Sequence, residues 1–199
     1  MKKFVRVESP KILQDNWERI GDEYTAKRSA DPSYRFQWPQ IDNERLNRTI
    51  IPALKVQTGS HCSYCDKFPL LRGDESIDHF KPKTEVQFYR EVCKWDNLYL
   101  ACKHCQDSKN IQYNLLLLRP DDDNYRFLRY FTYNYNEHRI DTNPAAAEEE
   151  KLMAEETIKV FDLNHPSMKI SRRHAFERYS KSENPDPEDY NFRFLFEQV

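Results

Sequence analysis

The sequence Cys62-Ser-Tyr-Cys65, followed after 36 further residues by Cys102-Lys-His-Cys105, decides the fold of this chain. Each C-x-x-C pair forms a tight turn that presents two thiolates, and two such pairs complete the tetrahedral shell of a structural zinc ion. The spacing therefore predicts a Zn²⁺ site made of Cys62, Cys65, Cys102 and Cys105. Such a site contributes on the order of 10 kcal/mol to folding.

The segment between the two pairs carries residues that are suited to catalysis. It contains Ile77-Asp78-His79-Phe80, which leads into Lys81-Pro82-Lys83, and later Trp95-Asp96-Asn97-Leu98. We expect strands over residues 76–80 and 95–101 and a helix over residues 103–118. A zinc ion that holds the two ends of the segment together would place Asp78 and His79 opposite the residues that follow Cys105. This layout is typical of a nuclease.

Length and composition indicate one compact domain. The chain has 199 residues, 38% of them hydrophobic and 32% charged. We expect an N-terminal helical region over 1–60, a zinc-stapled core over 61–119, and a β-hairpin with a helical C-terminal region over 120–199. Because the chain has no run of about 18 apolar residues and no apolar leader, we expect a cytoplasmic protein without membrane contact. A reducing compartment favours metal over disulfides, and the fifth cysteine, Cys93, is expected to be buried.

The charge balance argues against a general nucleic-acid binder with a basic face. The formal net charge is −2 and the isoelectric point is near 6.3. Over residues 120–199, acidic side chains outnumber basic ones by 17 to 11. Affinity for phosphate must therefore be local or come from a partner protein.

The flanking regions show helical and strand patterns. We expect helices over residues 10–30, from residue 46 towards Gly59 with an interruption near Pro52, over 143–161, and over 165–180. We expect a strand end and turn at 70–74, a strand at 125–135 and its hairpin partner at 137–140. Tyr34, Phe36 and Trp38 alternate with polar residues, which favours an extended segment against the core over an exposed base-stacking platform.

These motifs together resemble those of the HNH endonucleases, and most closely those of the HNH proteins of bacterial anti-phage systems: the Septu nuclease subunit and its retron-associated relatives. The resemblance rests on C-x-x-C, I-D-H-F-K-P-K, W-D-N-L-Y-L-A-C and C-x-x-x-K, over about 50 residues of the sequence. It implies an α+β fold in which a zinc-stapled ββα-metal finger lies among flanking α-helices. It also implies cleavage of DNA or RNA in phage defence beside an ABC-type ATPase.

The resemblance and the chemistry of phosphodiester hydrolysis assign roles to individual residues. A neutral imidazole near its ordinary pKa can take a proton from water, so His79 is the expected general base. By resemblance, Asp78 ligates a catalytic Mg²⁺ or Mn²⁺ and Asn97 holds the loop backbone and so orients His79. The candidate phosphate contacts are Lys81, Lys83 and Lys109.

The second ligand of the catalytic metal is open. The family carries Asn or His directly after the last cysteine of the second pair, where this chain has Gln106. Gln106 has the same amide oxygen on a longer arm. Asn110, four residues on and therefore on the same helical face, is an alternative, and Asp107 is a third. This departure keeps a second function class in view, a zinc-stapled module that binds nucleic acid or protein without cutting.

The remaining histidines have simpler expected roles. His61 and His104 adjoin cysteines of the two pairs, but four thiolates already fill a zinc shell. His138, His165 and His174 are expected to be surface or helix-capping residues.

Overall fold

The computed structural model describes residues 1–68 and 73–198, and these residues form a mixed α+β architecture. Within them, helices and 3-10 helices alternate with short strands that pair into three two-stranded antiparallel sheets. The α+β class is therefore as predicted. The turn predicted at 70–74 falls partly on residues 69–72, which lie outside the described residues.

A hairpin and a short helix stand at the centre of the molecule. Strand β3 (Glu75–His79) pairs with β4 (Leu98–Cys102), with Glu75 opposite Cys102 and His79 opposite Leu98. Helix α4 (Lys103–Lys109) follows β4 directly. Its length of about 10 Å nearly matches the roughly 13 Å of the strand. Because α4 runs back along the hairpin, its last residue returns to the end of β3.

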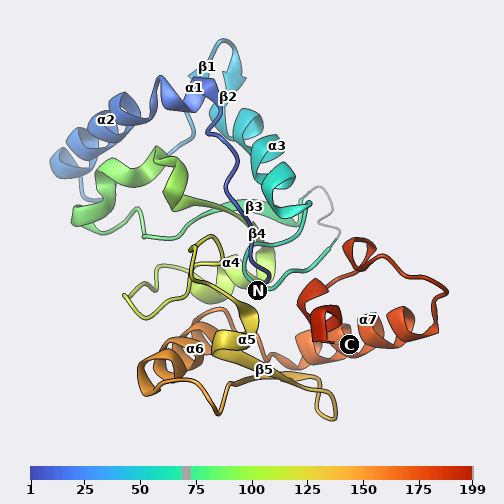
Figure 1. The fold of residues 1–199 in the computed structure, drawn as a ribbon. Helices are drawn as coiled ribbons and strands as arrows, with labels where there is room; N and C mark the ends of the chain where they lie inside the picture. Colours follow the sequence, from blue (N-terminus) through green and yellow to red (C-terminus); the bar gives the residue numbers. More distant parts are fainter. Residues whose placement is uncertain (69–72, 199) are drawn as a thin grey trace.

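The N-terminal elements lie on one side of this hairpin (Figure 1). They are α1 (Lys11–Gln14), α2 (Trp17–Ala30), β1 (Gln40–Ile41), β2 (Glu44–Arg45) and α3 (Leu46–Thr58). The first predicted helix is thus two helices, whereas α3 continues through Pro52. Helix α2 packs closely on the 3-10 helix η1 (Val86–Cys93): a Cβ at Gly21 would lie 2.2 Å from the Arg90 carbonyl oxygen, so only glycine fits there.

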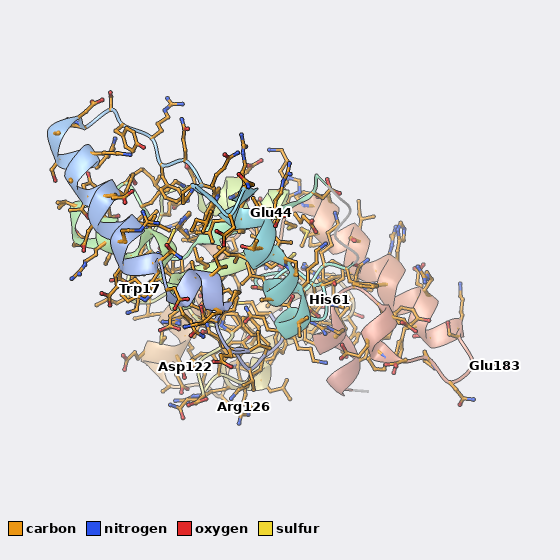
Figure 2. All side chains as sticks on the ribbon, turned by 90° about the horizontal axis from the view of Figure 1, so that it is seen from above. Trp17, Glu44, His61, Asp122, Arg126 and Glu183 are labelled. Atoms are coloured by element: carbon orange, nitrogen blue, oxygen red, sulfur yellow. The ribbon has the colours of Figure 1, made fainter. Side chains whose placement is uncertain are left out.

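The C-terminal elements lie on the other side of the hairpin in the same view (Figure 1). They are α5 (Phe127–Tyr130), β5 (Phe131–Asn134), β6 (Arg139–Thr142), α6 (Glu148–Val160), α7 (Pro166–Lys181) and the 3-10 helices η3 (Pro187–Asp189) and η4 (Arg193–Gln198). Figure 2, seen from above, shows Glu183, just after α7, far from the residues of α2.

Several predicted boundaries are wrong for local reasons. The helix expected over 103–118 ends at Lys109, because Asn110 has a positive φ of 48° that no helix continues. The strand expected from residue 95 begins at Leu98, after the 3-10 turn η2 (Trp95–Asn97). The strand expected from residue 125 begins with the helical turn α5, and the helix expected from residue 143 begins at Glu148.

Two predictions about buried side chains are confirmed. Phe36 and Trp38 are half-buried and pack against it, as expected for an extended inner segment. Cys93 is fully buried. Among residues 1–68 and 73–198, no helix has the length and apolar character needed to span a membrane.

Candidate functional site

The four cysteines of the two C-x-x-C pairs come together in the structure. Their sulfur atoms lie within 4.8 Å of one another, and all four residues are buried. The backbone N–H of Cys102 donates a hydrogen bond to Sγ of Cys62 at 3.3 Å, a contact that stabilises a thiolate. Four clustered sulfur donors with an N–H partner fit a structural zinc ion, so these cysteines could hold zinc as predicted.

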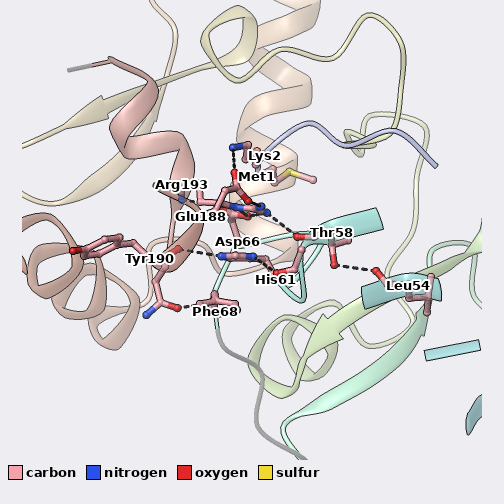
Figure 3. Close-up of polar contacts among 12 residues, drawn as sticks. Met1, Lys2, Leu54, Thr58, His61, Asp66, Phe68, Glu188, Tyr190 and Arg193 are labelled. Carbon is pink, nitrogen blue, oxygen red and sulfur yellow. Dashed lines mark hydrogen bonds and ion pairs between the residues drawn. The ribbon is translucent and has the colours of Figure 1, made fainter. Parts of the chain in front are cut away.

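The residue that follows the first cysteine pair is held by the C-terminal segment (Figure 3). Asp66, directly after Cys65, is only 1% exposed, and Arg193 surrounds its carboxylate. The Arg193 backbone N–H reaches Oδ2 at 2.6 Å, its Nη2 reaches Oδ1 at 2.6 Å, and Nη2 also donates to the Thr58 carbonyl at 2.9 Å. The sequence showed no sign of this pair, because 127 residues separate its members.

A cleft of about 460 Å³ opens beside the end of β3. Its walls include six residues singled out from the sequence: Asp78, His79, Lys83, Gln106, Asp107 and Asn110. The return of α4 along the hairpin explains this meeting, since Gln106 lies within α4, Asn110 follows its last residue, and Asp78 and His79 end β3.

Two side chains, those of Tyr64 and Lys109, hold the carboxylate of Asp78. Asp78 is 4% exposed. The Tyr64 hydroxyl donates to its Oδ2 at 2.7 Å, and Nζ of Lys109 lies 3.2 Å from the same oxygen. Burial raises the pKa of Asp78, although the Lys109 charge and the Tyr64 hydrogen bond act in the opposite direction. Tyr64, the inner residue of the first C-x-x-C, was missed from sequence.

Lys109 has a different place from the one expected. Its side chain is 0% exposed, and its Nζ also donates to the His79 carbonyl at 2.7 Å. A fully buried ammonium group that bridges Asp78 and the end of β3 supports the strand and is not a surface contact for phosphate. The prediction for this lysine is therefore corrected.

The imidazole of His79 is oriented and neutral. Its Nε2 lies 2.9 Å from the Val92 carbonyl, and because a carbonyl only accepts, Nε2 carries the proton and Nδ1 keeps its lone pair. Trp38 stacks on the ring at 5.7 Å and Phe36 meets it edge-on at 5.8 Å. Burial, assisted by the Lys83 charge, lowers the pKa of His79 to about 3.

Asn97 joins the loop after β3 to its surroundings. Its Oδ1 accepts the Lys81 backbone N–H at 2.7 Å, and its Nδ2 donates to the carbonyls of Lys81 and Glu91, each at 3.2 Å. These bonds fix the chain two residues beyond His79. Glu91 precedes Val92, whose carbonyl accepts the hydrogen bond of His79. Asn97 therefore connects the loop after His79 to the segment that holds the imidazole.

The remaining predicted residues differ in their access to the cleft. Gln106 donates its Nε2 to the Ile77 carbonyl at 3.3 Å, which directs its amide along β3. Asn110 is exposed at the end of α4, and Asp107 also lines the cleft while pairing with Lys103 at 2.7 Å.

The two lysines of the loop after β3 are not equivalent. Nζ of Lys81 pairs with the carboxylate of Glu91 at 3.0 Å and lies over the Phe88 ring. Lys83 lines the cleft itself. Burial lowers the pKa of Lys83, although the nearby charge of Asp78 raises it. Lys83 is therefore the predicted phosphate contact whose side chain borders the cleft.

The comparisons with known proteins add no relative. No protein-family model matches the sequence, and no curated protein matches it.

Proposed function

We propose that this chain is a metal-dependent HNH endonuclease that hydrolyses phosphodiester bonds of DNA or RNA. One observation carries the proposal: Asp78, His79, Lys83, Gln106 and Asn110 line a single cleft of about 460 Å³. An oriented imidazole, a carboxylate, amide oxygens and an ammonium group are the side chains that metal-assisted hydrolysis of a phosphodiester requires.

His79 is the general base of the proposed reaction. Its Nε2–H is held by the Val92 carbonyl, which leaves Nδ1 to take the proton of the attacking water. The lowered pKa keeps the ring neutral at physiological pH, and binding of an anionic phosphate beside it would raise that pKa towards the useful range. Stacking by Trp38 keeps the ring in one orientation.

The oxygen donors suit a hard divalent cation. The Asp78 carboxylate and the amides of Gln106 and Asn110 border the same cleft, and Mg²⁺ or Mn²⁺ prefers such ligands while keeping several waters. When bound, the cation supplies the charge that neutralises the scissile phosphate and the leaving oxygen. Tyr64 and Lys109 fix Asp78 through Oδ2, and Lys83 contacts a phosphate oxygen of the substrate.

The biological setting is proposed from the sequence resemblance. In it, the chain is the effector subunit of an anti-phage system and acts in the cytoplasm with an ABC-type ATPase. The charge distribution supports a partner, because the acidic region 120–199 provides no broad basic surface for nucleic acid. The ATPase would then help to retain the substrate near the cleft.

The second candidate function is a zinc-stapled module that binds nucleic acid or protein without cutting. It is favoured by the ion pair between Asp78 and Lys109, since the ammonium group competes with a metal ion for the same carboxylate. It is also favoured by Gln106, which stands where the related nucleases have Asn or His.

Cleavage assays separate the two candidates. Plasmid DNA and single-stranded RNA are incubated with the chain and Mg²⁺ or Mn²⁺, with and without the proposed ABC-type ATPase partner and ATP. We expect cleavage by the wild type and a loss of roughly 10²–10⁴-fold in His79→Ala. His79→Gln, which retains an amide donor for the Val92 carbonyl, should lose as much.

The control is His174→Ala, which removes an exposed histidine of α7 and should cut at the wild-type rate. Zinc content and the unfolding midpoint are measured for every variant, and we expect His79→Ala to keep its zinc and to remain folded under the assay conditions. Cleavage by the His79 variants at the wild-type rate would overturn the catalytic assignment. A folded wild type that cuts neither substrate under any of these conditions would favour the binding module.

A further inference from the structure

A second group of metal-ligating side chains lies outside the cleft and the cysteine cluster. His104 of α4, Asp162 of the connection between α6 and α7, and His165 at the start of α7 bring their ligand atoms within 4.8 Å of one another. We propose that these three residues form a binding site for a divalent transition metal, in addition to the zinc site of the four cysteines and independent of the proposed cleavage reaction.

One carbonyl oxygen holds the three residues together. The Asp162 carbonyl accepts the Nε2–H of His104 at 3.1 Å and the backbone N–H of His165, also at 3.1 Å. Because Nε2 of His104 carries the proton, its Nδ1 keeps the lone pair that a metal needs. A hydrogen bond from the second ring nitrogen to a backbone carbonyl is the usual support of a metal-binding histidine.

The side chain of Arg172 fixes the loop that carries Asp162 and His165. The buried guanidinium group of Arg172 donates to the Leu163 carbonyl at 2.7 Å and to Oδ1 of Asn164 at 3.1 Å. Asn164 in turn bonds both backbone groups of Ile140 in β6, at 2.9 and 2.7 Å. The site therefore needs little rearrangement to bind a metal, which favours affinity.

His165 also has a partner for its other nitrogen. Its Nδ1 lies 2.7 Å from Oγ of Ser167. When Nε2 binds a metal, Nδ1 carries the proton and donates to this hydroxyl. In the metal-free chain, the same Nδ1 accepts the Ser167 backbone N–H and caps α7, as the sequence predicted. The cap and the metal ligand thus use two tautomers of the same imidazole.

The donor set selects the kind of metal. Two imidazoles and one carboxylate suit Zn²⁺, Co²⁺ or Ni²⁺, whereas Mg²⁺ prefers oxygen ligands alone. His104 and Asp162 are half-buried and His165 is exposed, so water can complete the shell. Because His104 lies between Cys102 and Cys105, a metal here would join the cysteine-bearing helix α4 to the connection between α6 and α7.

The test counts metal ions bound by the full chain. Asp78→Asn serves as the parent, so that the cleft contributes no metal. After dialysis against micromolar Zn²⁺, elemental analysis should find two zinc ions per chain in the parent and one in parents that also carry Asp162→Asn or His165→Asn. Asparagine tolerates the positive φ of 46° at position 162 and is a good helix cap at 165, so both variants should fold. His174→Ala is the matched control and should keep two.

Cobalt spectra identify which site is lost. Cysteine-bound Co²⁺ gives an intense thiolate charge-transfer band, which the first equivalent should produce in the parent and in both variants. A further equivalent should add only weak ligand-field bands, in the parent and in His174→Ala alone. Equal zinc counts and identical cobalt titrations in the parent and in both variants would overturn the proposal and leave the cluster as a hydrogen-bonded helix cap.

Discussion

Two buried carboxylates, Asp66 beside the cysteine cluster and Asp78 in strand β3, are held in contrasting ways. Asp66, beside the cysteines, accepts bonds from Arg193 on both oxygens, at 2.6 Å each (Figure 3). Asp78, beside the cleft, receives the Tyr64 hydroxyl and the Lys109 ammonium group on the same oxygen, Oδ2. The first carboxylate is enclosed by a planar bidentate partner, and the second is held from one side only.

This difference separates a structural ion pair from a site that can exchange partners. A buried carboxylate satisfied on both oxygens has no capacity left for a ligand and serves to fix the chain. Asp78 keeps its second oxygen out of those two contacts and lines a cleft. Lys109 offers it a point charge without the fork geometry of arginine. A cation that enters the cleft has only the ion pair to displace.

Removal of the cysteine cluster should have the largest effect on both carboxylates. Asp66 follows Cys65, and Cys102 ends the strand opposite β3, so both carboxylates depend on it. We expect Cys102→Ser to lose zinc and the folded state, with a cost on the order of 10 kcal/mol. Zinc analysis and far-UV circular dichroism check this. Cys93→Ala removes a buried cysteine outside the cluster and should keep its zinc; a folded, zinc-free Cys102→Ser would contradict the structural role.

Removal of Arg193 should be the next largest effect. Arg193→Ala leaves Asp66 buried and unpaired, and we expect a loss of about 3–5 kcal/mol in the free energy of unfolding. Denaturant unfolding measures it. Arg173→Ala, which removes an exposed pair with Glu177, is the control and should cost about 0–1 kcal/mol. An equally small effect for Arg193→Ala would mean that the enclosed carboxylate is not a structural anchor.

Removal of Lys109 should cost less than removal of Arg193. We expect Lys109→Met to lose about 1–3 kcal/mol, because methionine fills the aliphatic volume, Tyr64 remains bonded to Asp78, and burial already favours a protonated Asp78. The same unfolding measurement compares the two variants. If Lys109→Met destabilises the chain as much as Arg193→Ala, the contrast between the two carboxylates fails.

Local sequence patterns predicted the elements that carry these carboxylates. The C-x-x-C turns, the strand through Asp78 and His79, and the loop at Lys81 follow from turn chemistry and residue spacing over a few positions. The end of α4 could not be predicted in this way. Asn110 has a positive φ, but the side-chain pattern around it continues to suit a helix.

Long-range partners account for the rest of what the sequence did not show. Lysine is almost never fully buried unless it is paired. The partner of Lys109 is Asp78, 31 positions earlier, and no residue near Lys109 in the sequence indicates this contact. Arg193 meets Asp66 across 127 residues. Such contacts arise only when the tertiary fold is complete. Asp78, His79 and Asn97 were therefore predicted, whereas the contacts made by Tyr64, Lys109 and Arg193 were not.

A third buried carboxylate, Asp121, tests the same difference through the dependence of stability on pH. Asp121 accepts Nε of Arg6 on Oδ2 and the Tyr99 hydroxyl on Oδ1, each at 2.6 Å, and so belongs with the enclosed type. Burial alone would raise its pKa, but the bonds and charges of Arg119, Arg6 and Tyr99 lower it below the ordinary value.

A lowered pKa in the folded state means that the unfolded state binds more protons in acid. The contribution of Asp121 is therefore fully present above the ordinary carboxyl pKa of 3.8 and is lost as the pH falls from there through the lowered pKa of the folded state. We expect Asp121→Asn to be less stable than the wild type at pH 7, with the difference shrinking towards pH 3. Urea unfolding across this range measures it. For Asp78, whose pKa is raised, the sign is opposite: the folded state binds more protons, so the wild type should gain stability relative to Asp78→Asn as the pH falls. A loss of wild-type stability relative to the asparagine variant at both positions in acid would show that the two kinds of carboxylate are held alike.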